Sequence, residues 1–141
     1  MFYHHFGGWA GFVGALPEHR ESEQTSRIVT LVAATTDPGE RVTVLKDLAV
    51  TVPHAAEAAI RVWAALDPDV GRAQRRVDDE RRAALERVVV GVVDDPVVAG
   101  RLAVLGVAVL VGFQQTCALP APAVLAALLD DFESVVRAHA R

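Results

Sequence analysis

Apolar residues recur every three or four positions along most of this chain, a spacing that predicts α-helices rather than strands. The longest stripe consists of Val70, Ala73, Val77, Ala84, Leu85, Val88 and Val92. A second stripe near the C-terminus consists of Val124 or Leu125, Leu128, Phe132, Val135 and His139. Arginines and acidic residues fill the opposite face of the first stripe, as expected of a helix with one side in solvent. We therefore expect an all-α fold of about six helices.

Proline residues mark where these helices begin. Asp37 precedes Pro38, and a glutamate follows three residues after the aspartate, which is the arrangement of a capping box. The pairs at 67–68 and 95–96 repeat this Asp-Pro start, because a proline at the first helical position loses no intrahelical hydrogen bond. Two further starts are expected at Pro53 and Pro120.

Two valine-rich runs have the composition of strands but are expected to be helical. Residues 88–93 and 104–111 are not bounded by hairpin turns, and both continue a helical stripe. Packing is therefore expected to override the weak helix propensity of valine. The apolar run 102–113 covers 12 residues, or ~18 Å as a helix, and is expected to be a buried helix too short for a hydrocarbon core of ~30 Å.

Composition narrows the function more than the fold. The chain has 141 residues, enough for one domain, and its net charge of −4 has the wrong sign for holding nucleic acid through its phosphates alone. A mildly acidic chain without a convincing signal peptide fits a cytoplasmic protein with a small-molecule or protein partner. Cys117 is the only cysteine, which excludes an internal disulfide and predicts an inert, buried thiol.

The residues present give little support to an enzyme. The serines at 22, 26 and 134 do not stand in the context of a nucleophile elbow, and no glycine-rich phosphate loop is visible. His4, His5 and His19 could hold a metal, but no acidic or cysteine ligand stands at a helpful spacing. The acidic pairs 94–95 and 130–131 are expected at solvated helix ends. We therefore expect no enzymatic activity, no cofactor and no resident metal.

Three segments carry a family resemblance. An aromatic and histidine-rich segment, Phe-Tyr-His-His-Phe-Gly-Gly at 2–8, precedes an apolar helix. Residues 59–68 form an apolar segment with a tryptophan that ends in Asp-Pro, and Arg-Val-Asp follows at 76–78. In this order they resemble the TetR (tetracycline-repressor) family of bacterial regulators, in which the first segment closes the helix-turn-helix and the others lie in the sensor domain.

The resemblance implies how the chain is divided. Residues 1–9 are expected to be the remnant of a helix-turn-helix recognition helix and its turn. Residues 10–141 are expected to form a helical ligand-sensing and dimerisation domain, whose long first helix runs from about 10 to 36 with a kink near Pro17. Met1 is expected to fall where the recognition helix is half complete.

The resemblance also implies DNA contacts. Tyr3 and His5 occupy positions that contact DNA phosphates in the family, whereas Trp9 stands where a lysine is common. The missing helices brace the recognition helix and supply most base and phosphate contacts in helix-turn-helix proteins. DNA binding is therefore expected only if those N-terminal helices are present.

The resemblance places an effector cavity among the middle helices, and three residues are candidates for its wall. Trp63 lies on the apolar face of its helix, where a core role is the alternative. Arg81 interrupts an apolar stripe and can bind a ligand carboxylate or phosphate bidentately, or else pair with Asp78 or Asp79. Gln114 follows an apolar run and can hydrogen-bond a ligand, a partner helix or water.

The last two helices are expected to form a dimer interface. Gly100, Gly106 and Gly112 recur every six residues on an apolar helix, which favours close packing against another helix. In the TetR family these two helices form a four-helix bundle across a two-fold axis, which implies a homodimer. The expected interface residues are Leu105, Val109, Gly112, Phe113, Leu125, Leu128 and Phe132. A buried helix pair within one chain is the alternative.

The sequence therefore predicts the effector-sensing and dimerisation part of a TetR-like transcriptional regulator. An unknown small molecule is expected to change the DNA affinity of the complete protein. The alternative is a stand-alone helical dimeric binding or interaction module without DNA-binding activity. In neither interpretation is the protein expected to bind or cross a membrane.

Overall fold

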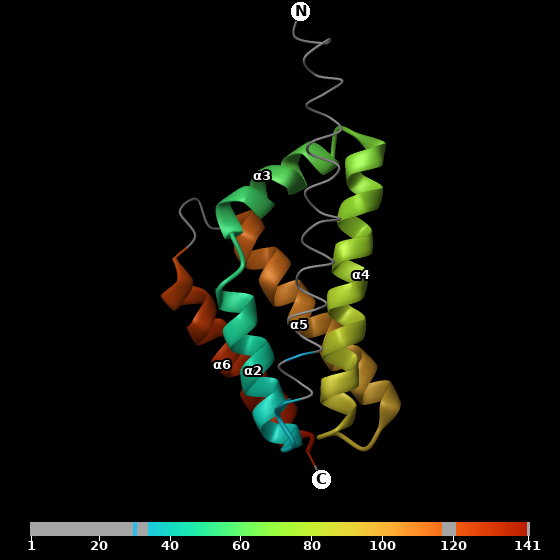
Figure 1. Cartoon of the computed structure of the whole chain (residues 1–141), viewed down its shortest axis with the longest axis vertical. Helices are drawn as coiled ribbons and strands as arrows, with labels where there is room; N and C mark the ends of the chain where they lie inside the picture. Colours follow the sequence, from blue (N-terminus) through green and yellow to red (C-terminus); the bar gives the residue numbers. More distant parts are fainter. Residues whose placement is uncertain (1–29, 31–33, 117–120, 141) are drawn as a thin grey trace, which may run out of the picture.

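The computed structural model describes residue 30 and residues 34–116 and 121–140, and this part of the chain contains helices but no strand (Figure 1). The helices are α2 (Pro38–Val50), α3 (His54–Ala64), α4 (Pro68–Val90), α5 (Pro96–Thr116) and α6 (Pro122–Ala138). The predicted all-α fold is confirmed. The remnant expected over 1–9, with Tyr3 and His5, lies outside the described residues, as do Cys117 and most of the first helix expected over 10–36.

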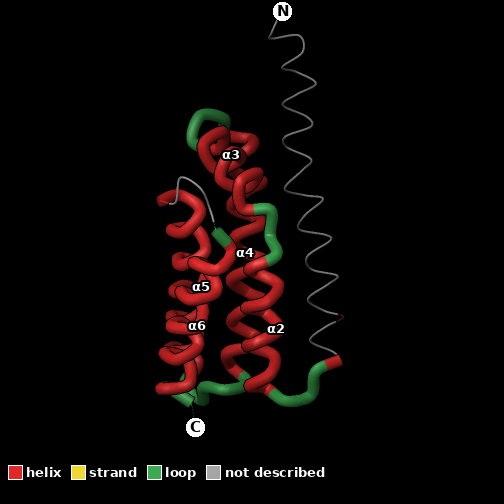
Figure 2. The backbone as a smooth tube through the Cα atoms, turned by 90° about the vertical axis from the view of Figure 1, so that its left-hand side faces the viewer, coloured by secondary structure: helices red, strands yellow, loops and turns green. Residues whose placement is uncertain are grey.

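Four helices run side by side and the fifth lies at one end of them (Figure 2). α5 and α6 lie on one side of the molecule, and α2 and α4 lie on the other. α2 packs against both α4 and α6, which closes the bundle, and α4 packs along α5. α3 lies beyond the end of α2, where it packs against α4 and α5.

Aspartate side chains begin three of the helices, as predicted. Asp37 Oδ2 accepts a hydrogen bond of 3.1 Å from the backbone N–H three residues later. Asp67 Oδ1 accepts two, of 2.9 and 3.2 Å, from the first turn of α4, and Asp95 Oδ1 accepts one of 2.9 Å in α5. These bonds satisfy first-turn donors that have no partner within the helix.

The other two starts differ slightly from the prediction. Pro53 is the residue that caps α3, so the helix itself starts one residue later. α6 starts at Pro122, with Ala121 as its extended cap, so the start predicted at Pro120 is wrong by two residues. A proline stands at both positions, and only one of them can be the first helical residue.

The predicted stripe of α4 forms much of the core. Its members Val70, Ala73, Val77, Ala84 and Val88 are buried. The helix ends at Val90, where Gly91 caps it, so the end of the valine run 88–93 forms a turn instead of the predicted helix. The run 104–111 is helical throughout, as predicted.

α6 buries two residues of the predicted stripe, Leu125 and Phe132, together with two residues outside it. Its buried residues are Leu125, Leu129, Phe132 and Val136. Leu128 and Val135, which the prediction placed on the buried side, are exposed. Because α6 is apolar on both faces, periodicity alone does not select one of them. The acidic pair 130–131 lies inside this helix and not at its end.

Of the three regularly spaced glycines in α5, Gly106 is the one at which a side chain would not fit. A methyl group on Gly106 would lie 2.9 Å from Phe132 Cζ of α6 and would overlap the Leu85 side chain of α4. Gly100 is less crowded, with a glutamate oxygen 3.0 Å from the same point, and Gly112 has no atom within 4 Å. The predicted close packing is therefore found at Gly106, whereas the position of Gly112 in the predicted interface stays a prediction.

Candidate functional site

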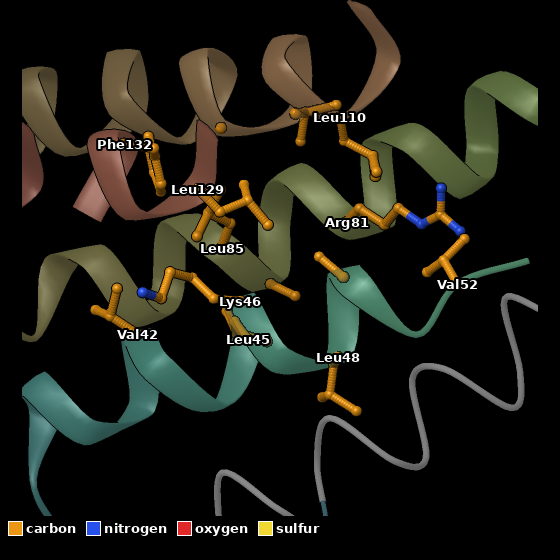
Figure 3. Close-up of a pocket in the computed structure, with 14 residues that line it drawn as sticks. Val42, Leu45, Lys46, Leu48, Val52, Arg81, Leu85, Leu110, Leu129 and Phe132 are labelled. Atoms are coloured by element: carbon orange, nitrogen blue, oxygen red, sulfur yellow. The ribbon is translucent and has the colours of Figure 1, made fainter. Parts of the chain in front are cut away.

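A cavity of about 100 Å³ lies between α2, α4, α5 and α6 (Figure 3). It is lined by Val42, Leu45, Lys46, Leu48, Ala49, Val52, Arg81, Ala84, Leu85, Gly106, Val107, Leu110, Leu129 and Phe132. This wall is almost wholly apolar, so water inside would find few hydrogen-bond partners.

Two cationic side chains belong to the wall, and both have carboxylate partners. In Figure 3 the Lys46 ammonium points toward Val42 at one end, and the Arg81 guanidinium lies near Val52 at the other. Between these ends the two side chains present mainly their aliphatic stems to the space. The cavity therefore has an apolar middle and a charged group at each end.

Lys46 holds α2 against α6. Its Nζ donates to Asp130 Oδ1 at 2.6 Å and to Glu133 Oε1 at 2.8 Å, and Glu133 also accepts from Arg137 at 2.9 Å. Burial works to lower the pKa of Lys46, but the hydrogen bonds and charges of the two carboxylates outweigh it and raise the pKa. Burial works to raise the pKa of Glu133, but Lys46 and Arg137 outweigh it and lower the pKa. Both groups are therefore charged near neutral pH.

Arg81 of α4 is bound to a deeply buried carboxylate of α3. Its two terminal nitrogens donate to the two oxygens of Glu57 at 2.8 and 2.6 Å, and the Glu57 side chain is only 2% exposed. Gln114 of α5 donates to the same carboxylate at 3.0 Å. The two hydrogen bonds from Arg81 and the third from Gln114 compensate the desolvation of the Glu57 carboxylate. Together these bonds link α3, α4 and α5 at one point.

Gln114 connects this pair to a second one. Its Oε1 accepts from Arg61 Nε at 2.8 Å, and Arg61 donates to both oxygens of Asp78 at 2.8 Å. Its amide nitrogen also lies 3.2 Å from His54 Nδ1. Because an amide nitrogen can only donate, Nδ1 accepts and the ring proton is on Nε2, which donates to the carbonyl of Val50 at 3.2 Å. The whole network therefore has matched donors and acceptors.

Of the three predicted pocket residues, only Arg81 lines the cavity. The alternative pairing of Arg81 with Asp78 or Asp79 is wrong, because Arg81 pairs with Glu57 of the neighbouring helix α3. Asp78 instead pairs with Arg61. The physical reason is that α3 packs against α4. The charged residues Glu57 and Arg61 of α3 therefore reach Arg81 and Asp78 of α4.

The other two predicted residues lie elsewhere. Gln114 is buried in the polar network, and Trp63 packs beside a small apolar cluster of Ile60 and Val70. The sequence interpretation missed His54, Glu57 and Arg61 as members of this network. Their spacing of three and four residues places them on one face of α3, which is the signal that could have found them.

The predicted dimer interface is only partly available to a partner. Three of its residues, Phe113, Leu125 and Phe132, are at most 5% exposed and belong to the core of the chain. Their assignment to the interface is therefore corrected. Leu105 and Leu128 are 41% and 40% exposed, and Val109 and Gly112 are half-buried.

We call the exposed side of α5 and α6 the outer apolar face. Its large apolar residues are Val97, Val104 and Leu105 on α5 and Val124, Leu128 and Val135 on α6. Each helix also carries one exposed charge in register with its stripe, Arg101 on α5 and Asp131 on α6. Neither charge has an ion pair within the ranges that the structure describes.

α5 is longer than the apolar run within it. It covers 21 residues, or ~31 Å, so the predicted argument from a 12-residue length is wrong. By length and composition it is the one described helix that could cross a membrane, and 33% of its most apolar window is buried. The core helix of a bundle passes the same test, and one face of α5 packs into this bundle as far as the buried Gln114.

Neither a metal site in the described residues nor a similarity to known proteins points to a function. In the described ranges, no three His, Cys, Asp or Glu side chains are grouped so as to hold a metal ion. Comparison with protein-family models, curated proteins and solved structures gives no match to the chain. The cavity, the buried network and the outer apolar face are the features of the described residues that bear on function.

Proposed function

We propose that this chain is the effector-sensing and dimerisation part of a TetR-like transcriptional regulator, acting in the cytoplasm as a homodimer without an enzymatic step. A small molecule among α2, α4, α5 and α6 would favour one orientation of the two chains, and so change the operator affinity of the complete protein. The observation that supports the proposal most is that α5 and α6 are each apolar on two faces. One face of each helix forms the core, and the other exposes large apolar side chains.

The outer apolar face is suited to a second copy of the same chain. Exposed apolar side chains that follow helical stripes on two adjacent helices mark a contact surface, because leaving them in water forgoes about 25 cal/mol per Å². In a two-fold dimer each contact occurs twice with the roles exchanged. Arg101 and Asp131 carry opposite charges on this face, so two copies can pair Arg101 of each with Asp131 of the other.

A charge-reversal series tests this arrangement. Light scattering would measure the mass of the native chain, of Arg101→Glu, of Asp131→Arg and of the double variant. Each single reversal is expected to weaken the dimer by placing like charges together, and the double variant is expected to restore it. A native chain that is monomeric, or a double variant that is no better than the singles, would contradict the proposed pairing.

DNA binding separates this proposal from a stand-alone interaction module. The net charge of −4 is unfavourable for phosphate contacts by the chain alone. Fusing the chain to two preceding helices of a helix-turn-helix and the first half of its recognition helix is expected to produce salt-dependent DNA binding that an effector weakens. Dimerisation without DNA binding in this fusion would favour the stand-alone module instead.

A further inference from the structure

We propose that the cavity between α2, α4, α5 and α6 binds a small, uncharged, apolar molecule, the size of one aromatic ring or a short branched alkyl chain. The inference deepens the proposed function and rests on it for the role of this molecule as effector. Binding itself follows from the size, the lining and the charges of the cavity.

The volume limits the molecule. The cavity measures about 100 Å³, whereas pockets for drug-sized ligands measure roughly 300–1,000 Å³. An apolar cavity of roughly 150 Å³ is large enough to take up benzene. A single ring or a branched chain of a few carbons therefore matches this volume.

The wall determines the polarity of the molecule. Leu45, Leu85 and Leu110, which project from three different helices, surround the space (Figure 3). Hydrocarbon surface of this kind favours a mainly apolar occupant and offers few partners to an amide or a charged group. The binding energy would come from replacing poorly hydrated space by close contact.

The two cations of the wall do not make this an anion site. The Arg81 charge is neutralised by Glu57 through two hydrogen bonds. The Lys46 charge is compensated by Asp130 and Glu133. A carboxylate ligand would have to displace one of these partners, which leaves a buried protein carboxylate without its cation. An anion is therefore expected to bind less tightly than a neutral molecule of the same shape.

Benzyl alcohol and benzoate provide a matched test, because they have similar size and differ in charge. Methyl NMR of the native chain would locate binding, and thermal unfolding would measure its strength. We expect benzyl alcohol to shift the methyl signals of Leu45, Leu85 and Leu110 and to raise the Tm. Benzoate is expected to bind roughly tenfold or more weakly. Equal affinities, or shifts confined to Val104 and Leu128 of the outer apolar face, would overturn the inference.

Two alanine-to-leucine variants test the location. Ala84 is buried in the wall, so Ala84→Leu adds three carbon atoms to the space and is expected to weaken benzyl alcohol binding roughly tenfold or more. Ala56 is exposed on α3, so Ala56→Leu makes the same chemical change outside the cavity and is expected to leave binding unchanged. If Ala84→Leu fails to fold, the methyl map of the native chain decides the question. Unchanged binding in folded Ala84→Leu would overturn the location.

The outcomes distinguish this inference from the proposed function. A monomeric chain that binds benzyl alcohol in the cavity would support the ligand class and contradict the dimer. A dimeric chain without a shift of the cavity methyl signals would contradict the ligand class and leave the dimer standing.

Discussion

The buried pair of Glu57 and Arg81 gives a sharp prediction about stability. Glu57→Leu would remove a carboxylate whose side chain is 2% exposed and which accepts two hydrogen bonds from Arg81 and one from Gln114. Leucine is apolar and similar in size to glutamate, so the main change is the loss of the carboxylate with its charge and hydrogen bonds. The Arg81 guanidinium would then be buried without this counter-charge.

The expected loss is about 4 kcal/mol. Breaking a buried ion pair from one side typically costs about 3–5 kcal/mol. Three hydrogen bonds to a charged group, at about 1.5 kcal/mol each, give a similar figure. For a chain of 141 residues this corresponds to a fall in Tm of roughly 12 °C.

Urea unfolding of a double-mutant cycle would measure the coupling. The cycle consists of Glu57→Leu, Arg81→Met and the double variant, with Glu80→Leu as a control at an exposed position of α4. The double variant is expected to recover at least half of the loss, because it buries neither charge, and the control is expected to stay within about 0.5 kcal/mol of the native chain. A loss below about 1 kcal/mol for Glu57→Leu, or additive single effects, would refute the reasoning.

Three further predictions concern packing, capping and pH. Gly106→Ala is expected to cost about 1–3 kcal/mol in chemical denaturation, because the added methyl group overlaps side chains of α4 and α6; a neutral result would contradict this close approach. Asp67→Ala is expected to cost about 1 kcal/mol in the same assay by removing the cap of α4, and Asp67→Asn much less; equal losses would contradict the capping role. Burial alone would raise the pKa of Glu133, but Lys46 and Arg137 lower it from 4.5, so its contribution to stability is present above that pH and is lost as the pH falls through the lowered value. Burial alone would lower the pKa of Lys46, but its two carboxylates raise it from 10.5, so the contribution of Lys46 to stability is lost only as the pH rises through the raised value. Thermal unfolding measured against pH should show both losses of stability, at acid pH for Glu133 and at alkaline pH for Lys46. If Glu133→Gln loses as much stability in acid as the native chain, the role given to Glu133 is wrong.

Local signals in the sequence were sufficient for much of the fold. Asp37, Asp67 and Asp95 cap helices because a short acidic side chain before a proline satisfies first-turn donors by itself. The stripe of α4 is correct because its opposite face is charged, so only one side can be buried. These features depend on neighbours in the sequence and need no knowledge of the rest of the chain.

The sites depended on contacts between helices, which periodicity does not contain. α6 is apolar on two sides, so the sequence could not choose between Leu128 and Leu129 for the core. The partner of Arg81 is Glu57, 24 residues away, and the prediction considered only acids within its own helix. The cavity itself is a property of four helices together, and a sequence pattern gives no measure of it.

The oligomeric state tests the central claim most directly. Sedimentation equilibrium at micromolar concentration would compare the native chain with Leu128→Glu on the outer apolar face and with Leu66→Glu, a matched change at a residue 85% exposed beyond the end of α3. We predict twice the chain mass of 15.1 kDa for the native chain and for Leu66→Glu, and a single chain mass for Leu128→Glu. A native mass of 15.1 kDa, or equal masses for the two variants, would contradict the account.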